Sequence, residues 1–165
     1  TSAAAWARGP PLTKDERMTD TRTTTRNPLD TTPVPVQGKL AAAWASFMFL
    51  YIYVDYFGLY KPGVLEDILA GVVFEFVVSP ALLTVFLLLV SIPALMVALS
   101  AALPARANRL VNLVVGALYI PITVFNAVGE SWEWAPFYAL SIGLELLLLA
   151  YILRTAVTWP RRSAQ

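Results

Sequence analysis

The chain contains neither cysteine nor histidine in its 165 residues. These absences exclude disulfides and thiol nucleophiles, and they remove the commonest zinc, copper and haem ligands and the usual general base near neutral pH. Charge is also scarce, because only 14% of the residues are charged and the formal net charge is +1. Gly-rich phosphate loops, GxSxG elbows and HExxH metal motifs are missing as well. We therefore expect no enzyme, no metal, no cofactor and no nucleic-acid partner.

Hydrophobic residues, in contrast, make up 58% of the chain. They gather in four stretches, at residues 40–57, 80–103, 110–128 and 136–157. Each stretch is close to the ~20 residues that cross ~30 Å of hydrocarbon at ~1.5 Å per residue. Short segments with Gly, Pro and charged residues separate them. The sequence predicts an all-α, antiparallel four-helix transmembrane bundle over residues 39–160, with the lipid bilayer as its partner.

The two ends of the chain are polar. Residues 1–38 are rich in Thr, Pro and Arg, a composition that cannot bury enough apolar surface to fold alone, so they are predicted to form a disordered cytoplasmic tail. Residues 1–17 precede an internal Met18 and are interpreted as an added segment or an upstream extension. Residues 161–165 form a short basic tail at the other end.

The distribution of positive charge predicts the orientation. If the N-terminus is cytoplasmic, Lys61 is the only one of the 12 Lys and Arg residues on the outer side. Positively charged flanks stay in the cytoplasm, so both termini are predicted to be cytoplasmic. Trp132 and Trp134 at an outer boundary and Trp159 at an inner one agree with this topology, because aromatic residues favour membrane interfaces.

The segment at residues 64–79 is too polar and too short to span. Its first half is amphipathic, with Val64, Leu65 and Ile68 set against Glu66 and Asp67. We expect an interfacial or partly re-entrant helix on the outer face. A hairpin around residues 72–78 is the alternative, because the alternation there fits a strand as well.

Polar residues recur at helical spacing in the third and fourth stretches. The third stretch carries a stripe at spacings of 4, 3, 4, 3 and 4, formed by Asn112, Gly116, Tyr119, Thr123, Asn126 and Glu130. The other three stretches carry comparable sets, namely Trp134, Tyr138, Ser141 and Glu145; Trp44, Met48, Tyr51 and Asp55; and Thr84, Ser91 and Ala98. Such spacing places each set on one helix face. We predict an interior that is polar toward the outside, and cytoplasmic ends that are basic and otherwise plain.

Glu145 is predicted to be the deepest ionisable group. It lies nine residues beyond Pro136, or about 14 Å along a helix, near the membrane midplane. A lone carboxylate there costs at least ~2.5 kcal/mol, and the sequence places no Lys or Arg at a comparable depth. We expect Glu145 to rest protonated, or to hold a bound cation or cationic ligand. Asp55 and Asn126 are expected near the outer boundary.

Two functions follow from these patterns. In the first, an outward-facing cavity binds or translocates a proton, a small cation or a small polar molecule, and a homodimer would supply further helices for a transport path. The residues predicted to line this cavity are Asp55, Tyr51, Asn126, Glu130 and Glu145, with Tyr119 and Thr123 along its wall. In the second, the protein is a structural or accessory membrane subunit without a ligand, and the polar stripes only hold helices together. Asp55 and Glu130 would then be solvated helix ends, and Pro93 and Pro121 would bend their helices.

Several motifs resemble a family of uncharacterised bacterial four-helix integral membrane proteins. They lie at residues 39–63, at 103–109 (Leu-Pro-Ala-Arg-Ala-Asn-Arg), at 119–121 (Tyr-Ile-Pro) and at 126–132 (Asn-Ala-Val-Gly-Glu-Ser-Trp). The resemblance covers residues 39–160. It implies a bacterial origin and a place in the cytoplasmic (inner) membrane, and it transfers no site or substrate.

Overall fold

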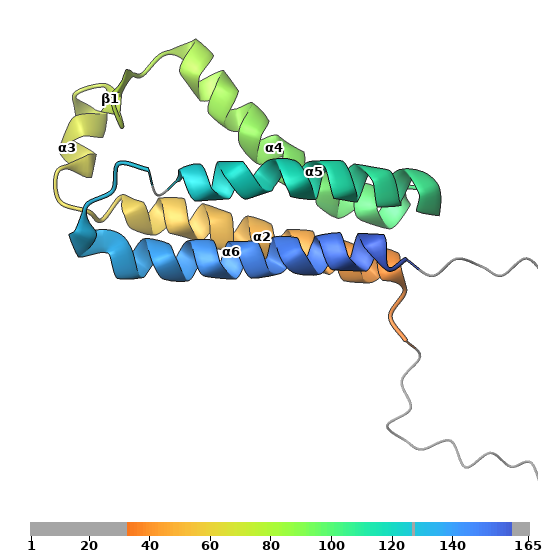
Figure 1. Ribbon diagram of the computed structural model, residues 1–165. Coiled ribbons are helices and arrows are strands. Elements are labelled where there is room, and N and C mark those ends of the chain that lie inside the picture. The colour runs from red at the N-terminus through yellow and green to blue at the C-terminus, as the bar shows by residue number, and fades with distance from the viewer. Residues whose placement is uncertain (1–32, 127, 160–165) are drawn as a thin grey trace, which may run out of the picture. The chain divides into compact units, whose positions relative to one another are not determined.

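Four long helices dominate the computed structural model, which describes residues 33–126 and 128–159 (Figure 1). They are α2 (Val36–Gly58), α4 (Pro80–Ala102), α5 (Ala105–Phe125) and α6 (Ala135–Val157). All four are long and apolar enough to cross a membrane. The prediction of a mostly helical chain with four helices that could span a membrane is therefore confirmed. Residues 1–32 of the tail predicted at residues 1–38, and the whole tail predicted at residues 161–165, lie outside the described residues.

Two helices begin earlier than predicted, and a proline stands directly before each start. Helix α2 begins at Val36, directly after Pro35, so the last three residues of the predicted tail are helical. Helix α5 begins at Ala105 and ends at Phe125, whereas the apolar stretch suggested residues 110–128. Pro104 ends the turn after α4, and its carbonyl accepts a hydrogen bond from the Asn108 N–H at 2.9 Å. A proline is readily accepted at a helix start, so polar residues after it can join the helix.

The helices pack side by side and share one interior. Helix α2 packs against α4 and α6, and α5 packs mainly against α6. The start of α2, the α4–α5 turn and the end of α6 lie together and are called the arginine end below (Figure 1). The opposite end, which carries the α2–α3 and α5–α6 connections, is called the Lys61 end. Trp44, Phe47 and Tyr119 meet edge to face in the core, with ring centroids 5.7 to 6.2 Å apart.

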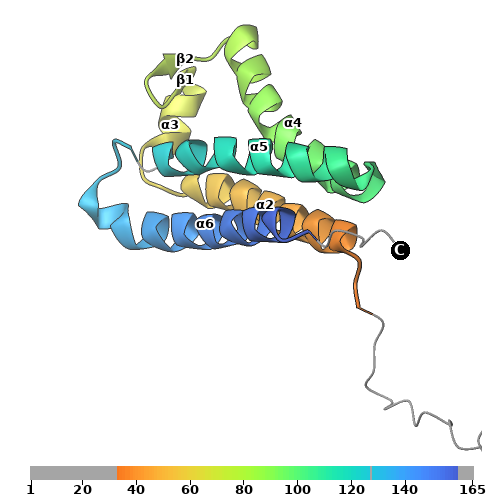
Figure 2. The same cartoon turned by 45° about the vertical axis from the view of Figure 1, so that its right-hand side comes forward.

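Helix α4 leaves the other helices over its first half. Its buried residues all lie in the second half (Pro93, Met96 and Ser100), and the first half leans away from α5 (Figures 1 and 2). Pro93 has no N–H to donate to the carbonyl of Leu89, four residues earlier. The Tyr119 hydroxyl of α5 donates to that carbonyl instead. A hydrogen bond between α5 and α4 thus replaces the missing backbone bond at the point where α4 begins to lean away from α5.

The connection between α2 and α4 contains both structures that the sequence allowed. A short helix, α3 (Val64–Leu69), is followed by a hairpin of β1 (Val72–Val73) and β2 (Phe76–Val77) (Figure 2). Val72 pairs with Val77 and Val73 with Phe76. The helix begins after Gly63, whose φ of 87° favours glycine. The amphipathic half is therefore helical, and the alternating half is extended.

Candidate functional site

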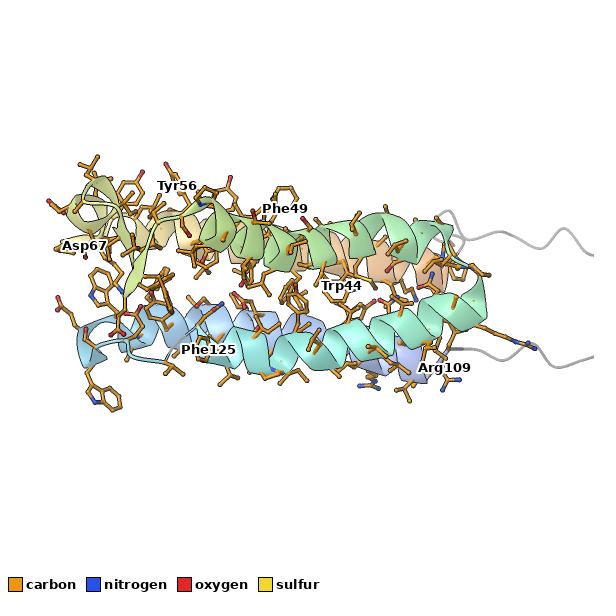
Figure 3. The ribbon with its side chains drawn as sticks, turned by 90° about the horizontal axis from the view of Figure 1, so that it is seen from above. Trp44, Phe49, Tyr56, Asp67, Arg109 and Phe125 are labelled. Atoms are coloured by element: carbon orange, nitrogen blue, oxygen red, sulfur yellow. The ribbon has the colours of Figure 1, made fainter. Side chains whose placement is uncertain are left out.

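A buried polar network lies near the arginine end. The Trp44 indole N–H donates to Asn112 Oδ1 at 2.7 Å, and the Asn112 amide donates to Asn108 Oδ1 at 2.7 Å and to Ser100 Oγ at 3.3 Å. The Asn108 amide donates to the Ser100 carbonyl at 2.5 Å. All four residues are buried, and Trp44 points into the interior while Phe49 of the same helix points outward (Figure 3).

This network corrects the prediction that the basic ends of the helices are otherwise plain. Its amides are paired within the protein and join α2, α4 and α5, as polar side chains that hold neighbouring helices together do. Asn108 lies one turn before Asn112 and extends the predicted stripe, which is a signal that sequence reasoning missed. No spacing pattern pointed to Ser100, because the hydroxyl residues predicted to face inward on its helix were Thr84 and Ser91. Both of these bond to carbonyls of their own helix and are not buried.

A second group of polar residues surrounds Glu145 on α6. The Glu145 side chain is only 2% exposed, and Thr123 of α5, which is fully buried, lies beside its carboxyl group. Glu145 Oε2 and Thr123 Oγ1 are buried without a hydrogen-bond partner among the described residues. In residues 33–126 and 128–159 the one ion pair joins Lys61 to Glu130, so no base neutralises Glu145 there. Buried polar atoms without partners are rare, and here they come from two facing helices.

Helix α2 adds two residues to this group. Tyr51 is buried and its side chain neighbours Asn126 at the end of α5, while Asp55 lies near both Tyr51 and Glu145. Asp55 itself is exposed. We call Tyr51, Asp55, Thr123, Asn126 and Glu145 the Glu145 cluster. The structure therefore brings together five of the seven predicted site residues.

The other two predicted site residues have different surroundings. Tyr119 lies near Tyr51, but its hydroxyl bonds to the Leu89 carbonyl of α4. Glu130 belongs to a separate group at the Lys61 end, where it forms the ion pair with Lys61. Its distance along the chain from Lys61, 69 residues, explains why sequence reasoning left both charges unpaired.

Lys61 is held by more than Glu130. Its Nζ donates to the Tyr138 hydroxyl at 3.3 Å and lies 5.2 Å and 5.6 Å from the ring centroids of Tyr138 and Trp134. Burial opposes the charge on Lys61, but the hydrogen bonds to Glu130 and Tyr138 outweigh that cost and raise the pKa of the Lys61 ammonium group. The group ties the connection after α2 to the start of α6.

An open groove of about 510 Å³ lies between α2 and α6 near the arginine end. Lys39, Ala42 and Leu148 are among its lining residues, and no member of the Glu145 cluster is. The outward cavity predicted around Glu145 therefore stays a prediction. In the part of the chain that the structure describes, no three His, Cys, Asp or Glu side chains are grouped so as to hold a metal ion.

Four helices of membrane-spanning length and composition define the class: a multi-pass helical membrane protein. Within that class the chain belongs to a protein family of unknown function (DUF6326), which matches residues 36–164. The family resemblance drawn from the sequence motifs is thereby confirmed as membership of an uncharacterised family. The chain matches no curated protein and no solved structure.

Proposed function

We propose that the four helices form an antiparallel bundle across the cytoplasmic membrane of a bacterium, with both termini in the cytoplasm. The support comes from charge: Lys39, Arg106, Arg109 and Arg154 belong to helix ends at the arginine end, and Lys61 belongs to the other. Lys and Arg are retained on the cytoplasmic side, so the arginine end would face the cytoplasm. The family resemblance supports the bacterial membrane.

We further propose that the Glu145 cluster binds a proton or a small cation. The observation that carries the proposal is the Glu145 carboxyl, which is almost fully buried and has an oxygen with no partner among the described residues. A bare carboxylate at this depth costs at least ~2.5 kcal/mol, so it is neutralised by a proton or by a cation. Thr123 and Asn126 would offer uncharged oxygen ligands beside it.

Access to the cluster would be from the Lys61 end. Asp55 is exposed and lies near Glu145, so it can pass a proton or cation between the outside and the buried carboxyl. On the side of the cluster that faces the arginine end, the rings of Trp44, Phe47 and Tyr119 pack together. In this conformation the protein would bind from outside, and translocation would require these rings to move.

Glu145→Gln tests the proposal, because the amide keeps the shape of the side chain and cannot ionise. We expect infrared pH titration of the purified protein to lose the carbonyl band of a buried protonated acid. We also expect proteoliposomes with an enclosed pH dye to lose any proton flux of the wild type. Glu133→Gln is the matched control, since Glu133 is exposed. A Glu145→Gln protein with the titration and flux of the wild type would refute the site.

A second candidate function is that of an accessory membrane subunit. The specific support is helix α4, whose first half leans away from α5 and exposes Leu83 and Leu87 (Figure 1). Such a helix can pack against a helix of another protein. This function requires a stoichiometric partner that co-purifies with the wild type and is lost when Leu83 and Leu87 are replaced by alanine. Recovery of the protein alone from mild detergent would contradict it.

A further inference from the structure

The groove between α2 and α6 is lined mostly by apolar atoms, which suits the binding of a hydrocarbon chain. Gly38 and Ala42 line it from α2 with few side-chain atoms, and Leu148 and Tyr151 line it from α6. Ser46 also lines it, but its hydroxyl donates to the Ala42 carbonyl at 3.0 Å and needs no ligand. An acyl chain can fill such a space without leaving a polar group unpaired.

One end of the groove carries positive charge. Lys39 lines the groove and is exposed, and it has no ion-pair partner among residues 33–126 and 128–159. Arg154 lies three residues beyond Tyr151, so it projects from the same face of α6, one turn nearer the arginine end. Apart from buried Glu145, the described acidic residues lie at positions 55–75 and 130–133, toward the other end. No acidic side chain in the described part of the chain therefore competes for Lys39 and Arg154.

We propose that the groove binds an anionic phospholipid. Its acyl chain would lie between α2 and α6, and its phosphate would meet Lys39 and Arg154 at the membrane surface. Basic pockets between helices at the cytoplasmic surface bind such headgroups, and each Lys or Arg near anionic lipid contributes about 1 kcal/mol. This lipid site does not depend on the Glu145 cluster.

A second copy of the chain is the competing occupant. Gly38, Ala42 and Ser46 are spaced by four residues, a pattern that lets two helices approach closely. Two α2 helices packed through this face would, however, bring two Lys39 side chains together, and no acidic residue of the described chain lies at this end to separate their charges. The charge at the groove thus favours a lipid phosphate.

Native mass spectrometry of the full chain, released from nanodiscs containing equal amounts of phosphatidylglycerol and phosphatidylcholine, tests the proposal. We expect the wild type to retain phosphatidylglycerol preferentially. Lys39→Gln should reduce that preference about five-fold, the effect of one basic contact. Arg106→Gln is the matched control, because Arg106 is an exposed base at the same end that does not line the groove.

Ala42→Leu provides a second, independent measurement, because leucine fills the groove and leaves the charges in place. We expect it to release both lipids, while its thermal unfolding in detergent stays cooperative. Equal lipid retention in the wild type, Lys39→Gln and Ala42→Leu would overturn the proposal. A wild-type dimer in phosphatidylcholine alone that Ala42→Leu dissociates would also overturn it, and would assign the groove to a second copy.

Discussion

Replacing Asn112 with leucine tests whether the network near the arginine end holds the helices together. Leucine has a similar size but offers neither donor nor acceptor, so the change removes the contacts of Asn112 with Trp44 on α2 and with Ser100 on α4. Hydrogen bonds between helices in a membrane contribute about 0.6 kcal/mol each, so the two contacts account for about 1.2 kcal/mol. The Trp44 N–H is also left buried without an acceptor, which costs a further 1–3 kcal/mol or so.

We therefore expect Asn112→Leu to lower the free energy of unfolding by about 2–4 kcal/mol. Reversible unfolding in mixed micelles, followed by tryptophan fluorescence or steric trapping, measures this change. Trp44→Phe removes the orphaned donor, so the double variant should be more stable than the sum of the single effects predicts, by about 1 kcal/mol. Ser46→Ala is the control, because the Ser46 hydroxyl bonds only within its own helix. Strictly additive effects of Trp44→Phe and Asn112→Leu would refute the reasoning.

Two other contacts give predictions of the same kind. Tyr119→Phe leaves the Leu89 carbonyl without a donor and should lower the free energy of unfolding by about 0.6–1.7 kcal/mol. The loss should be smaller in a Pro93→Ala background, because alanine restores the backbone N–H that can bond to this carbonyl. Equal losses in both backgrounds would contradict this. The raised pKa of Lys61 means that the folded state holds this proton more tightly than the unfolded chain. The ion pair with Glu130 should therefore stabilise the protein below the ordinary lysine pKa of 10.5, and this gain should fade as the pH rises through the higher folded value. Thermal unfolding of the wild type against Glu130→Gln checks this, and a difference that persists unchanged at strongly alkaline pH would contradict it.

The residues of the candidate site could be predicted only as far as spacing along a single helix identifies them. Asn112, Gly116, Tyr119 and Thr123 are buried as their spacing indicated, because residues three and four apart share a helix face in any fold. The same rule found Glu145, which is buried on α6. Periodicity says which face turns inward, and it does not say which residue of another helix that face meets.

The sequence by itself determined that the chain has four apolar helices and which faces of α5 and α6 are polar, because length, hydropathy and helical spacing are local properties. Only the tertiary structure decided which side chains of different helices contact one another. It paired Trp44 with Asn112 across 68 residues and Lys61 with Glu130 across 69, and it brought Asp55 close to Glu145. These choices depend on which helices are neighbours and how each is rotated about its axis, and no spacing along one helix contains that information.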